Sequence, residues 1–134
     1  MNRLLIIVGS QSDIPLLKDL EQQLTKAKIT YDIEIASCHR DLDTLYQLLT
    51  TIKDGRYRAV VAVANAVSNM PAIVASYLKD TATVVVGVGL SDKGMNGIDS
   101  LLAINTIPKG VPLVTTGLGA TGLHNAGLFV AKLF

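Results

Sequence analysis

The segment Ser37-Cys38-His39-Arg40 combines side chains that can move protons and bind anions. A histidine without perturbing neighbours titrates near pH ~6.5, so His39 is a candidate general acid and base at neutral pH. Arg40 stays charged, and its planar guanidinium matches the geometry of a phosphate. The alternatives are an incidental loop histidine and a solvated surface arginine. The position of the segment, directly after a predicted strand, favours a functional site.

A second candidate is the polar segment Gly9-Ser10-Gln11-Ser12-Asp13, which follows five consecutive apolar residues. Helical spacing begins after Asp13, so the pattern indicates a strand, a tight turn and a helix. Free backbone N–H groups and the positive end of the helix dipole meet at such a turn and readily hold an anion, most often a phosphate. Ser12 and Asp13 are also favoured helix caps, so capping alone explains the same residues.

Three further groups invite chemistry more weakly. Cys38 suggests a thiolate nucleophile, but neighbouring residues at a strand end project to opposite sides, so we interpret it as a small buried residue. Asp92 and Lys93 lie in a glycine-rich loop, and three roles stay open: contact with the site, a mobile cover over it, or a purely structural loop. The second histidine, His124, begins the last predicted helix and is interpreted as structural or solvent-facing.

The elements that must position these residues alternate along the chain between buried strands and helices. The predicted strands are 4–8, 31–36, 59–64, 83–88 and 112–116, and the predicted helices are 14–28, 42–53, 71–79, 98–104 and 123–134. This alternation predicts a parallel sheet of about five strands covered on both faces, a three-layer flavodoxin-like, Rossmann-like α/β fold. The polar alternation of 31–36 favours a place near a sheet edge. Ligands bind such sheets outside the carboxyl ends of the strands, where both candidate segments lie.

Length and composition narrow the class of protein. The chain has 134 residues, of which 49% are apolar and 17% charged, and its net charge is +1. These values predict one globular domain, residues 1–134, and argue against nucleic acid or a membrane surface as a partner. No apolar run approaches the roughly 20 residues of a membrane helix, and no signal peptide precedes the first strand. The single cysteine excludes an internal disulfide, so we expect a cytoplasmic protein.

Several of these segments together resemble the PurE family, the N5-carboxyaminoimidazole ribonucleotide mutases of bacterial purine synthesis. Residues 9–13 resemble the family's Gly-Ser-x-Ser-Asp motif, and residues 37–40 match its Ser-Ala-His-Arg. Residues 96–102, 107–112 and 125–128 also match in order and spacing. The resemblance covers essentially the entire chain.

This resemblance implies a reaction that moves a carboxylate from nitrogen to carbon through released CO2, with no metal and no organic cofactor. The site residues that it implies are His39 as the catalytic acid and base, and a substrate-binding set of Ser10, Ser12, Asp13, Ser37, Arg40, Ser68 and Asn69. The segment 9–13 would hold ribose and phosphate, and Ser37 and Arg40 would take the phosphate. The resemblance also implies a homo-oligomer, octameric in the family, whose members usually continue beyond the position of Phe134 into a helix that packs on neighbouring subunits.

Residues 65–71 depart from the family's Gly-Gly-Ala-Ala-His-Leu-Pro motif. Asn69 stands where the family has a second active-site histidine, and asparagine hydrogen-bonds a carboxylate but does not titrate. Residues 65–68 instead faintly resemble the Asn-Ala-Leu-Ser of the family's second class, which carboxylates aminoimidazole ribonucleotide with free CO2. Arg40 argues the other way, since that class has lysine there. Three functions stay open: the mutase, the CO2-dependent carboxylase, and a degenerate member that binds a ribonucleotide without turnover.

Overall fold

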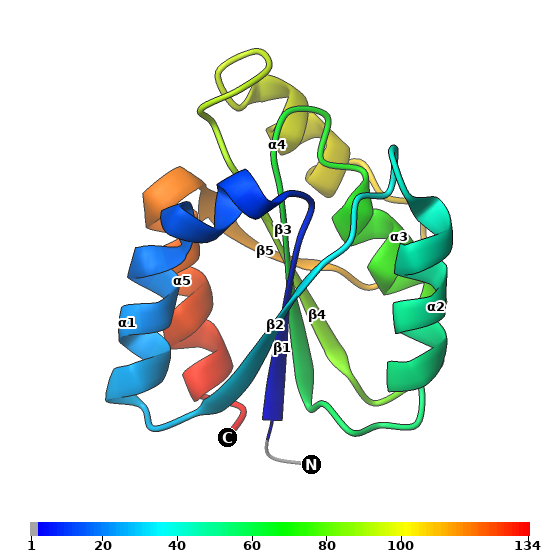
Figure 1. The fold of residues 1–134 in the computed structure, drawn as a ribbon, viewed down its shortest axis with the longest axis vertical. Coiled ribbons are helices and arrows are strands. Elements are labelled where there is room, and N and C mark those ends of the chain that lie inside the picture. Colours follow the sequence, from blue (N-terminus) through cyan, green and yellow to red (C-terminus); the bar gives the residue numbers. More distant parts are fainter. Residues whose placement is uncertain (1–2) are drawn as a thin grey trace.

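Residues 3–134 of the computed structural model form one five-stranded parallel sheet with helices on both faces (Figure 1). The strands are β1 (Arg3–Val8), β2 (Thr30–Ile35), β3 (Ala59–Ala64), β4 (Val84–Gly89) and β5 (Val114–Leu118). The helices are the 3-10 helix η1 (Gln11–Leu17), α1 (Lys18–Lys26), α2 (Leu42–Ile52), α3 (Met70–Tyr77), α4 (Ile98–Asn105) and α5 (Gly119–Ala131). The order β2-β1-β3-β4-β5 confirms the predicted flavodoxin-like class and the edge position of the second strand. Met1 and Asn2, which belong to the predicted domain 1–134, lie outside the described residues.

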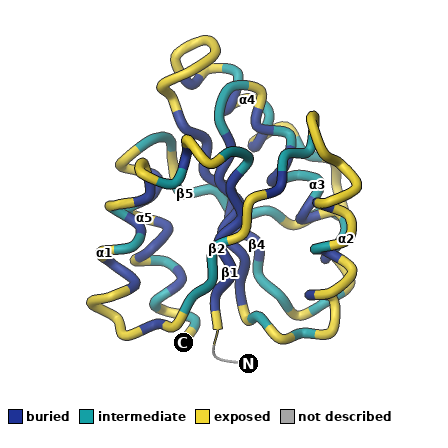
Figure 2. Tube along the Cα trace, viewed as in Figure 1, coloured by how far each residue is buried: buried dark blue, intermediate teal, exposed yellow. Residues whose placement is uncertain are grey.

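The sheet has a separate apolar core on each face. Residues 4–8 of β1 and 59–63 of β3 are completely inaccessible to solvent, as the dark blue centre of Figure 2 shows. The even-numbered residues of β1 pack with α1 and α5, whereas Leu5 and Ile7 pack with α2 and α3. Burial of each aliphatic side chain contributes about 2 kcal/mol, so the central strands support the loops at their ends. No helix within residues 3–134 is long and apolar enough to cross a membrane.

The first helical segment differs from the prediction in its opening turns. Residues 11–17 form a 3-10 helix that contains Pro15, and α-helical bonding begins only at Lys18. Proline carries no backbone N–H and therefore interrupts the hydrogen-bond ladder of an α-helix. The capping hydroxyl is that of Ser10, which accepts a hydrogen bond from Ser12 N at 3.3 Å. The predicted cap, Ser12 or Asp13, was therefore placed too late.

The C-terminal elements also start at other residues than predicted. Strand β5 lies two residues after the predicted 112–116, and its pairing with β4 is irregular between Gly87 and Gly89. Helix α5 begins at Gly119 rather than at 123, and ends at 131. The glycines there indicated a loop, but Gly122 lies so close to the Gly117 carbonyl that a Cβ would overlap it. The glycines of this segment thus permit a tight strand-to-helix join.

Candidate active site

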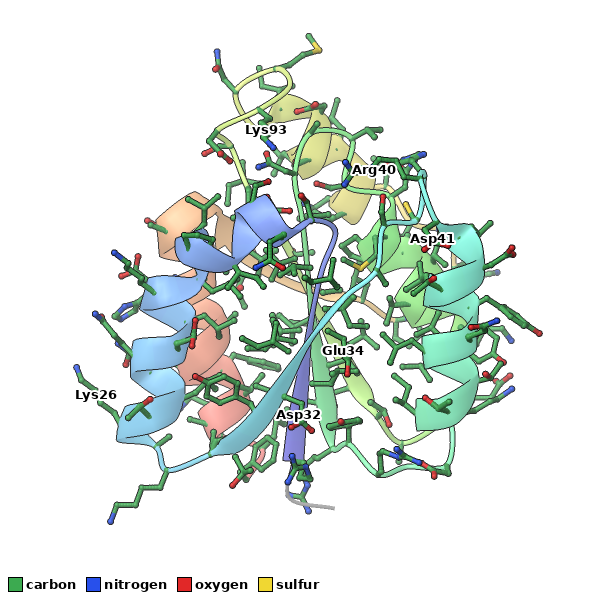
Figure 3. All side chains as sticks on the ribbon, viewed as in Figure 1. Lys26, Asp32, Glu34, Arg40, Asp41 and Lys93 are labelled. Atoms are coloured by element: carbon green, nitrogen blue, oxygen red, sulfur yellow. The ribbon has the colours of Figure 1, made fainter. Side chains whose placement is uncertain are left out.

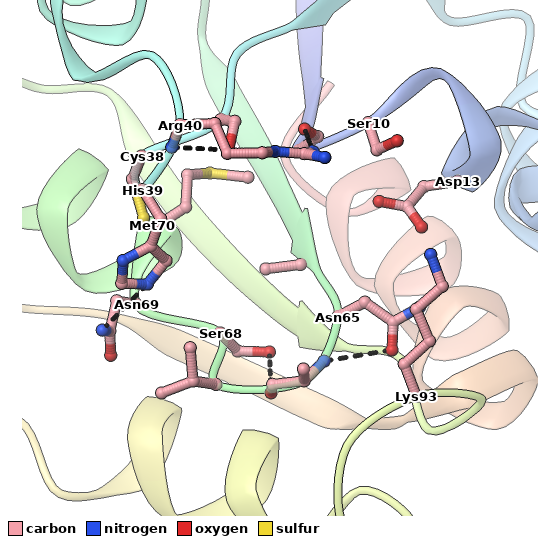
Figure 4. Close-up of a pocket in the computed structure, with 15 residues that line it drawn as sticks. Ser10, Asp13, Cys38, His39, Arg40, Asn65, Ser68, Asn69, Met70 and Lys93 are labelled. Carbon is pink, nitrogen blue, oxygen red and sulfur yellow. Dashed lines mark hydrogen bonds between the residues drawn. The ribbon is translucent and has the colours of Figure 1, made fainter.

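The carboxyl ends of β1, β2 and β3 open into a pocket of about 300 Å³ (Figure 4). The loops after these three strands supply most of the lining, and the loop after β4 supplies Lys93. The lining includes seven of the eight predicted site residues: Ser10, Asp13, Ser37, His39, Arg40, Ser68 and Asn69. Ser12 does not line the pocket; its hydroxyl lies 3.0 Å from that of Ser10.

Arg40 joins the first two of these loops. Its Nη2 donates to the Gly9 carbonyl at 3.0 Å, and its Nε donates to the Ser37 hydroxyl at 3.3 Å. The same hydroxyl accepts from the Arg40 backbone N–H at 3.2 Å, which tightens the turn before α2. The predicted cap of α2, Asp41, accepts from the Thr44 backbone N–H at 3.3 Å. Within residues 3–134 no carboxylate lies at ion-pair distance from the Arg40 guanidinium, so its positive charge is available to an anionic ligand.

His39 and Asn69 meet at the side of the pocket opposite Asp13 and Lys93 (Figure 4). The Asn69 Nδ2 atom lies 3.2 Å from Nε2 of His39, although the residues come from the loops after β2 and β3. The imidazole is exposed to solvent, and the asparagine is half-buried. An exposed imidazole at the mouth of a pocket can exchange protons with a bound molecule.

Asp13 is the one charged residue among 3–134 that is almost completely buried, with 3% of its surface exposed. Its Oδ1 atom has no hydrogen-bond partner among the described residues. A buried polar atom without a partner carries a desolvation penalty that a bound donor can offset. On the same side of the pocket, the Lys93 ammonium donates to the Ser12 hydroxyl at 3.4 Å. This side therefore offers both an acceptor and a cation to a polar ligand.

The loop after β3 is held in an uncommon backbone conformation. Ala66 and Ser68 have φ values of +53° and +27°, a region that costs free energy for any residue with a Cβ. The Ser68 hydroxyl donates to the Ala66 carbonyl at 3.1 Å and lies 2.7 Å from the hydroxyl of the buried Ser100 in α4. Ser68 thus lines the pocket while its hydroxyl fastens the loop to α4.

Two polar residues that line the pocket were not among the site residues predicted from the sequence. Asn65 was not predicted; its amide donates to Asp92 at 2.5 Å and its Oδ1 accepts from the Ala66 N–H at 3.0 Å. Its position directly after a buried strand was the signal that could have identified it. Lys93 was left open and lines the pocket, whereas Asp92 does not line it.

The remaining reactive groups do not form a second centre. Cys38 lines the pocket, and burial raises the pKa of its thiol, which favours the neutral, poorly nucleophilic form. His124 lies elsewhere, in α5, with Nδ1 3.4 Å from the Gln23 amide nitrogen of α1. Within residues 3–134 no three His, Cys, Asp or Glu side chains are grouped closely enough to hold a metal ion.

A comparison with known proteins identifies a family that this chain matches. A family model described as AIR carboxylase matches residues 3–134. The N5-carboxyaminoimidazole ribonucleotide mutase of Bacillus subtilis is 34% identical over 128 residues, covering 96% of this chain and 77% of that protein. The corresponding mutase of Haemophilus influenzae is 30% identical, covering 96% of this chain and 76% of its own length.

Solved structures agree on the fold. The crystal structure of Treponema denticola PurE superposes with a TM-score of 0.81 at 20% identity, covering 98% of this chain and 79% of that one. A 3-dehydroquinate dehydratase-like protein from Bifidobacterium longum superposes less closely, with a TM-score of 0.60 at 16% identity, covering 99% of this chain and 98% of that one. At these identities the structural matches establish the architecture alone.

Proposed function

The chain belongs to the AIR carboxylase family, and on that premise we propose that it converts N5-carboxyaminoimidazole ribonucleotide into 4-carboxyaminoimidazole ribonucleotide in purine biosynthesis. Relatives at 30% and 34% identity that carry the mutase name are matched over 96% of this chain. The product would be an isomer of the substrate, so the enzyme would be an isomerase.

One observation carries this proposal: a single pocket gathers an acid–base group and a cation that no carboxylate of residues 3–134 neutralises. His39 lies at its rim, and Arg40 spans the Gly9 carbonyl and the Ser37 hydroxyl. We assign the substrate phosphate to Arg40 with Ser37 and Ser10, since a guanidinium and hydroxyls suit phosphate oxygens. We assign the ribose hydroxyls to Asp13, whose buried Oδ1 needs a donor, with Ser12 supporting that loop.

The reaction needs two proton transfers and retention of CO2. The bond between the exocyclic nitrogen and its carboxylate breaks, CO2 is released, and the nitrogen takes up one proton. C4 of the imidazole then attacks the CO2, and the proton on C4 is removed, so no net proton is consumed. We assign these transfers, including the proton on C4, to His39, because an imidazole can both donate and accept a proton and one such group can complete the cycle. Holding CO2 beside C4 replaces a bimolecular encounter with a local one.

A second candidate is the carboxylation of aminoimidazole ribonucleotide by free CO2. Residues 65–68 favour it, because they depart from the glycine-rich mutase motif and faintly resemble the Asn-Ala-Leu-Ser of the carboxylase class. Arg40 favours the mutase, since the second class has lysine there.

The deciding experiment offers the purified protein each substrate separately. N5-carboxyaminoimidazole ribonucleotide is supplied with ¹³C-bicarbonate and carbonic anhydrase, which labels any CO2 that escapes. A mutase converts N5-carboxyaminoimidazole ribonucleotide into unlabelled 4-carboxyaminoimidazole ribonucleotide. Product that forms only from aminoimidazole ribonucleotide and bicarbonate establishes the carboxylase. Conversion of neither substrate, with ribonucleotide binding retained, would overturn both and leave a binding protein without turnover.

We further propose that residues 1–134 act as one catalytic domain in a cytoplasmic homo-oligomer. The family resemblance supports the single domain and the oligomer, and the single cysteine supports the cytoplasmic location. Sedimentation of the purified protein tests the assembly. A monomer at micromolar concentration with full activity would contradict the oligomer.

A further inference from the structure

We propose that Asn69 orients two partners at once: one N–H of its side-chain amide holds Nε2 of His39, and the other receives the carboxylate of the substrate. The inference rests on the proposed function, because it names the group that aligns the migrating carboxylate with the acid–base residue.

The first support is the contact itself. Asn69 Nδ2 lies 3.2 Å from Nε2 of His39, and an amide nitrogen only donates, so Nε2 is the acceptor. A neutral imidazole with Nε2 as acceptor carries its proton on Nδ1. In the resting protein the contact therefore selects the Nδ1–H tautomer of His39 and fixes the orientation of the ring. Nε2 takes up a proton during the reaction only after it leaves the Asn69 amide.

The second support is a donor left over. The Asn69 amide carries two N–H groups on one nitrogen, and within residues 3–134 its side chain makes no hydrogen bond besides that to His39. The residue lines the pocket, so an acceptor bound there can reach the second N–H. A neutral histidine has a single N–H and cannot donate to both an imidazole and a carboxylate. Asparagine can donate to both without a proton of its own to lose.

The third support is the position of Asn69 at the start of α3. Asparagine is among the best residues for capping the first turn of a helix with its side chain. Asn69 occupies the N-cap position, yet its side chain makes no capping hydrogen bond and turns to His39 instead. Because the helix does not depend on this side chain, Asn69→Ala is expected to fold with little loss of stability.

The loop after β3 holds the backbone of Asn69 in place. Ser68, the preceding residue, is 2% exposed and hydrogen-bonded to Ser100 of α4. Met70, the following residue, is also 2% exposed. The Asn69 backbone is thus held between two buried neighbours, and only its side chain is left to adjust to a ligand.

The first test needs no substrate. In ¹⁵N spectra of the imidazole rings at pH ~8.5, about two units above the ordinary histidine pKa, His39 of the unchanged protein shows an unprotonated Nε2. Asn69→Ala shifts His39 toward the Nε2–H tautomer, while Gln47→Ala, an exposed amide on α2, leaves it unchanged. The variant His124→Gln assigns the signals, since the chain has two histidines. An identical His39 tautomer in the unchanged protein and in Asn69→Ala would overturn the inference.

The second test separates the carboxylate from the rest of the ligand. Calorimetry compares 4-carboxyaminoimidazole ribonucleotide with aminoimidazole ribonucleotide, which lacks the carboxylate. Asn69→Ala is expected to bind the carboxylated ligand about tenfold more weakly, the effect of one hydrogen bond to a charged group, and the other ligand as before. Asn69→Asp, which places a like charge beside the carboxylate, is expected to weaken binding further.

Equal losses for both ligands would overturn the inference while leaving the proposed reaction untouched. Conversely, a protein that converts neither substrate but shows the selective loss retains the Asn69 assignment and refutes the reaction. The conversion assay and the two binding curves therefore fail independently.

Discussion

The two ends of the sheet carry similar polar groups in opposite states. At the amino end, Arg3 and Asp32 form an ion pair at 2.6 Å, and Tyr57 donates to the other oxygen of the same carboxylate at 2.7 Å. At the carboxyl end, the Arg40 guanidinium has no carboxylate partner within residues 3–134, and Oδ1 of Asp13 is buried without a donor. Figure 3 shows Asp32 near the N-terminus of the chain and Arg40 with Lys93 at the other end of the molecule.

This difference distinguishes a structural end of the sheet from a functional end. Charged groups that pair with one another stabilise the fold and have no free hydrogen-bonding capacity for a ligand, whereas unpaired buried polar groups lower stability and can bind one. The backbone follows the same division, because Ala66 and Ser68 adopt left-handed conformations beside the pocket. Strain and unpaired polar groups that gather at one place are typical of binding and catalytic sites.

The largest expected effect comes from the proton-transferring group of the pocket. His39→Asn should lower turnover by about 10²- to 10⁴-fold, the usual contribution of a general acid and base, while ribonucleotide affinity stays within a few-fold. Steady-state conversion and calorimetry measure the two quantities, with His124→Gln as the control. Loss of binding instead of turnover would assign His39 to the pocket wall.

The next effect concerns the cation. Arg40→Ala should weaken binding of a phosphorylated ligand by about 10- to 100-fold, because one or two charge-assisted hydrogen bonds are lost. The nucleoside without phosphate should bind the variant and the unchanged protein equally. Arg56→Ala, a surface arginine already paired with Asp54 at 3.2 Å, is the matched control. If Arg40→Ala weakened the binding of both ligands equally, Arg40 would not be the residue that binds the phosphate.

The strands and most of the pocket residues were predictable from the sequence, because local patterns of apolar and polar residues determine them. Apolar runs identified the strands, and parallel strands place the loops after them at one edge, which brought Ser37, His39 and Arg40 to the pocket. The amino-end network was not predicted, since Arg3, Asp32 and Tyr57 are far apart in the chain and meet only through strand pairing. The same reason hid the contact between His39 and Asn69, which are 30 residues apart.

The local backbone conformation of the loops was the other feature that the sequence did not predict. Lost glycines in residues 65–68 indicated added bulk, but did not show that Ala66 would keep the left-handed conformation that glycine favours. The 3-10 start of the first helix and the early start of α5 were missed for a similar reason. Proline and glycine indicate that a regular helix or strand is interrupted, but the packing of neighbouring residues determines which backbone conformation the interrupted segment adopts.

A smaller effect follows from that strain. Ala66→Gly should raise the free energy of unfolding by about 0.5–1 kcal/mol, because a glycine at φ +53° avoids the Cβ clash and loses only part of this gain to chain entropy. Ala72→Gly in α3, where the backbone is helical, should lower it by about 1 kcal/mol. Urea denaturation measures both. A loss of stability at Ala66 equal to that at Ala72 would show that the loop is not strained.

The smallest effect belongs to the amino end and should leave the pocket untouched. The hydrogen bond from Arg3, followed by that from Tyr57, lowers the pKa of Asp32 below its ordinary value of 3.8. A carboxyl group whose pKa is lower in the folded state contributes stability above the unfolded pKa and loses it as the pH falls through the folded pKa. Asp32→Asn should therefore lower the unfolding midpoint slightly at pH 7 and narrow that difference as the pH falls below 3.8. The effect is small because Arg3 and Asp32 are both partly exposed and solvent screens the pair.

Thermal unfolding from neutral to acidic pH measures this difference, and conversion at pH 7 should equal that of the unchanged protein. Tyr57→Phe removes one of the two hydrogen bonds and should show part of the same pH dependence. A difference between Asp32→Asn and the unchanged protein that stays constant down to acidic pH would mean that the network stabilises by packing rather than by charge. A change in conversion would mean that the two ends of the sheet are coupled through β1, and the division between a structural and a functional end would fail.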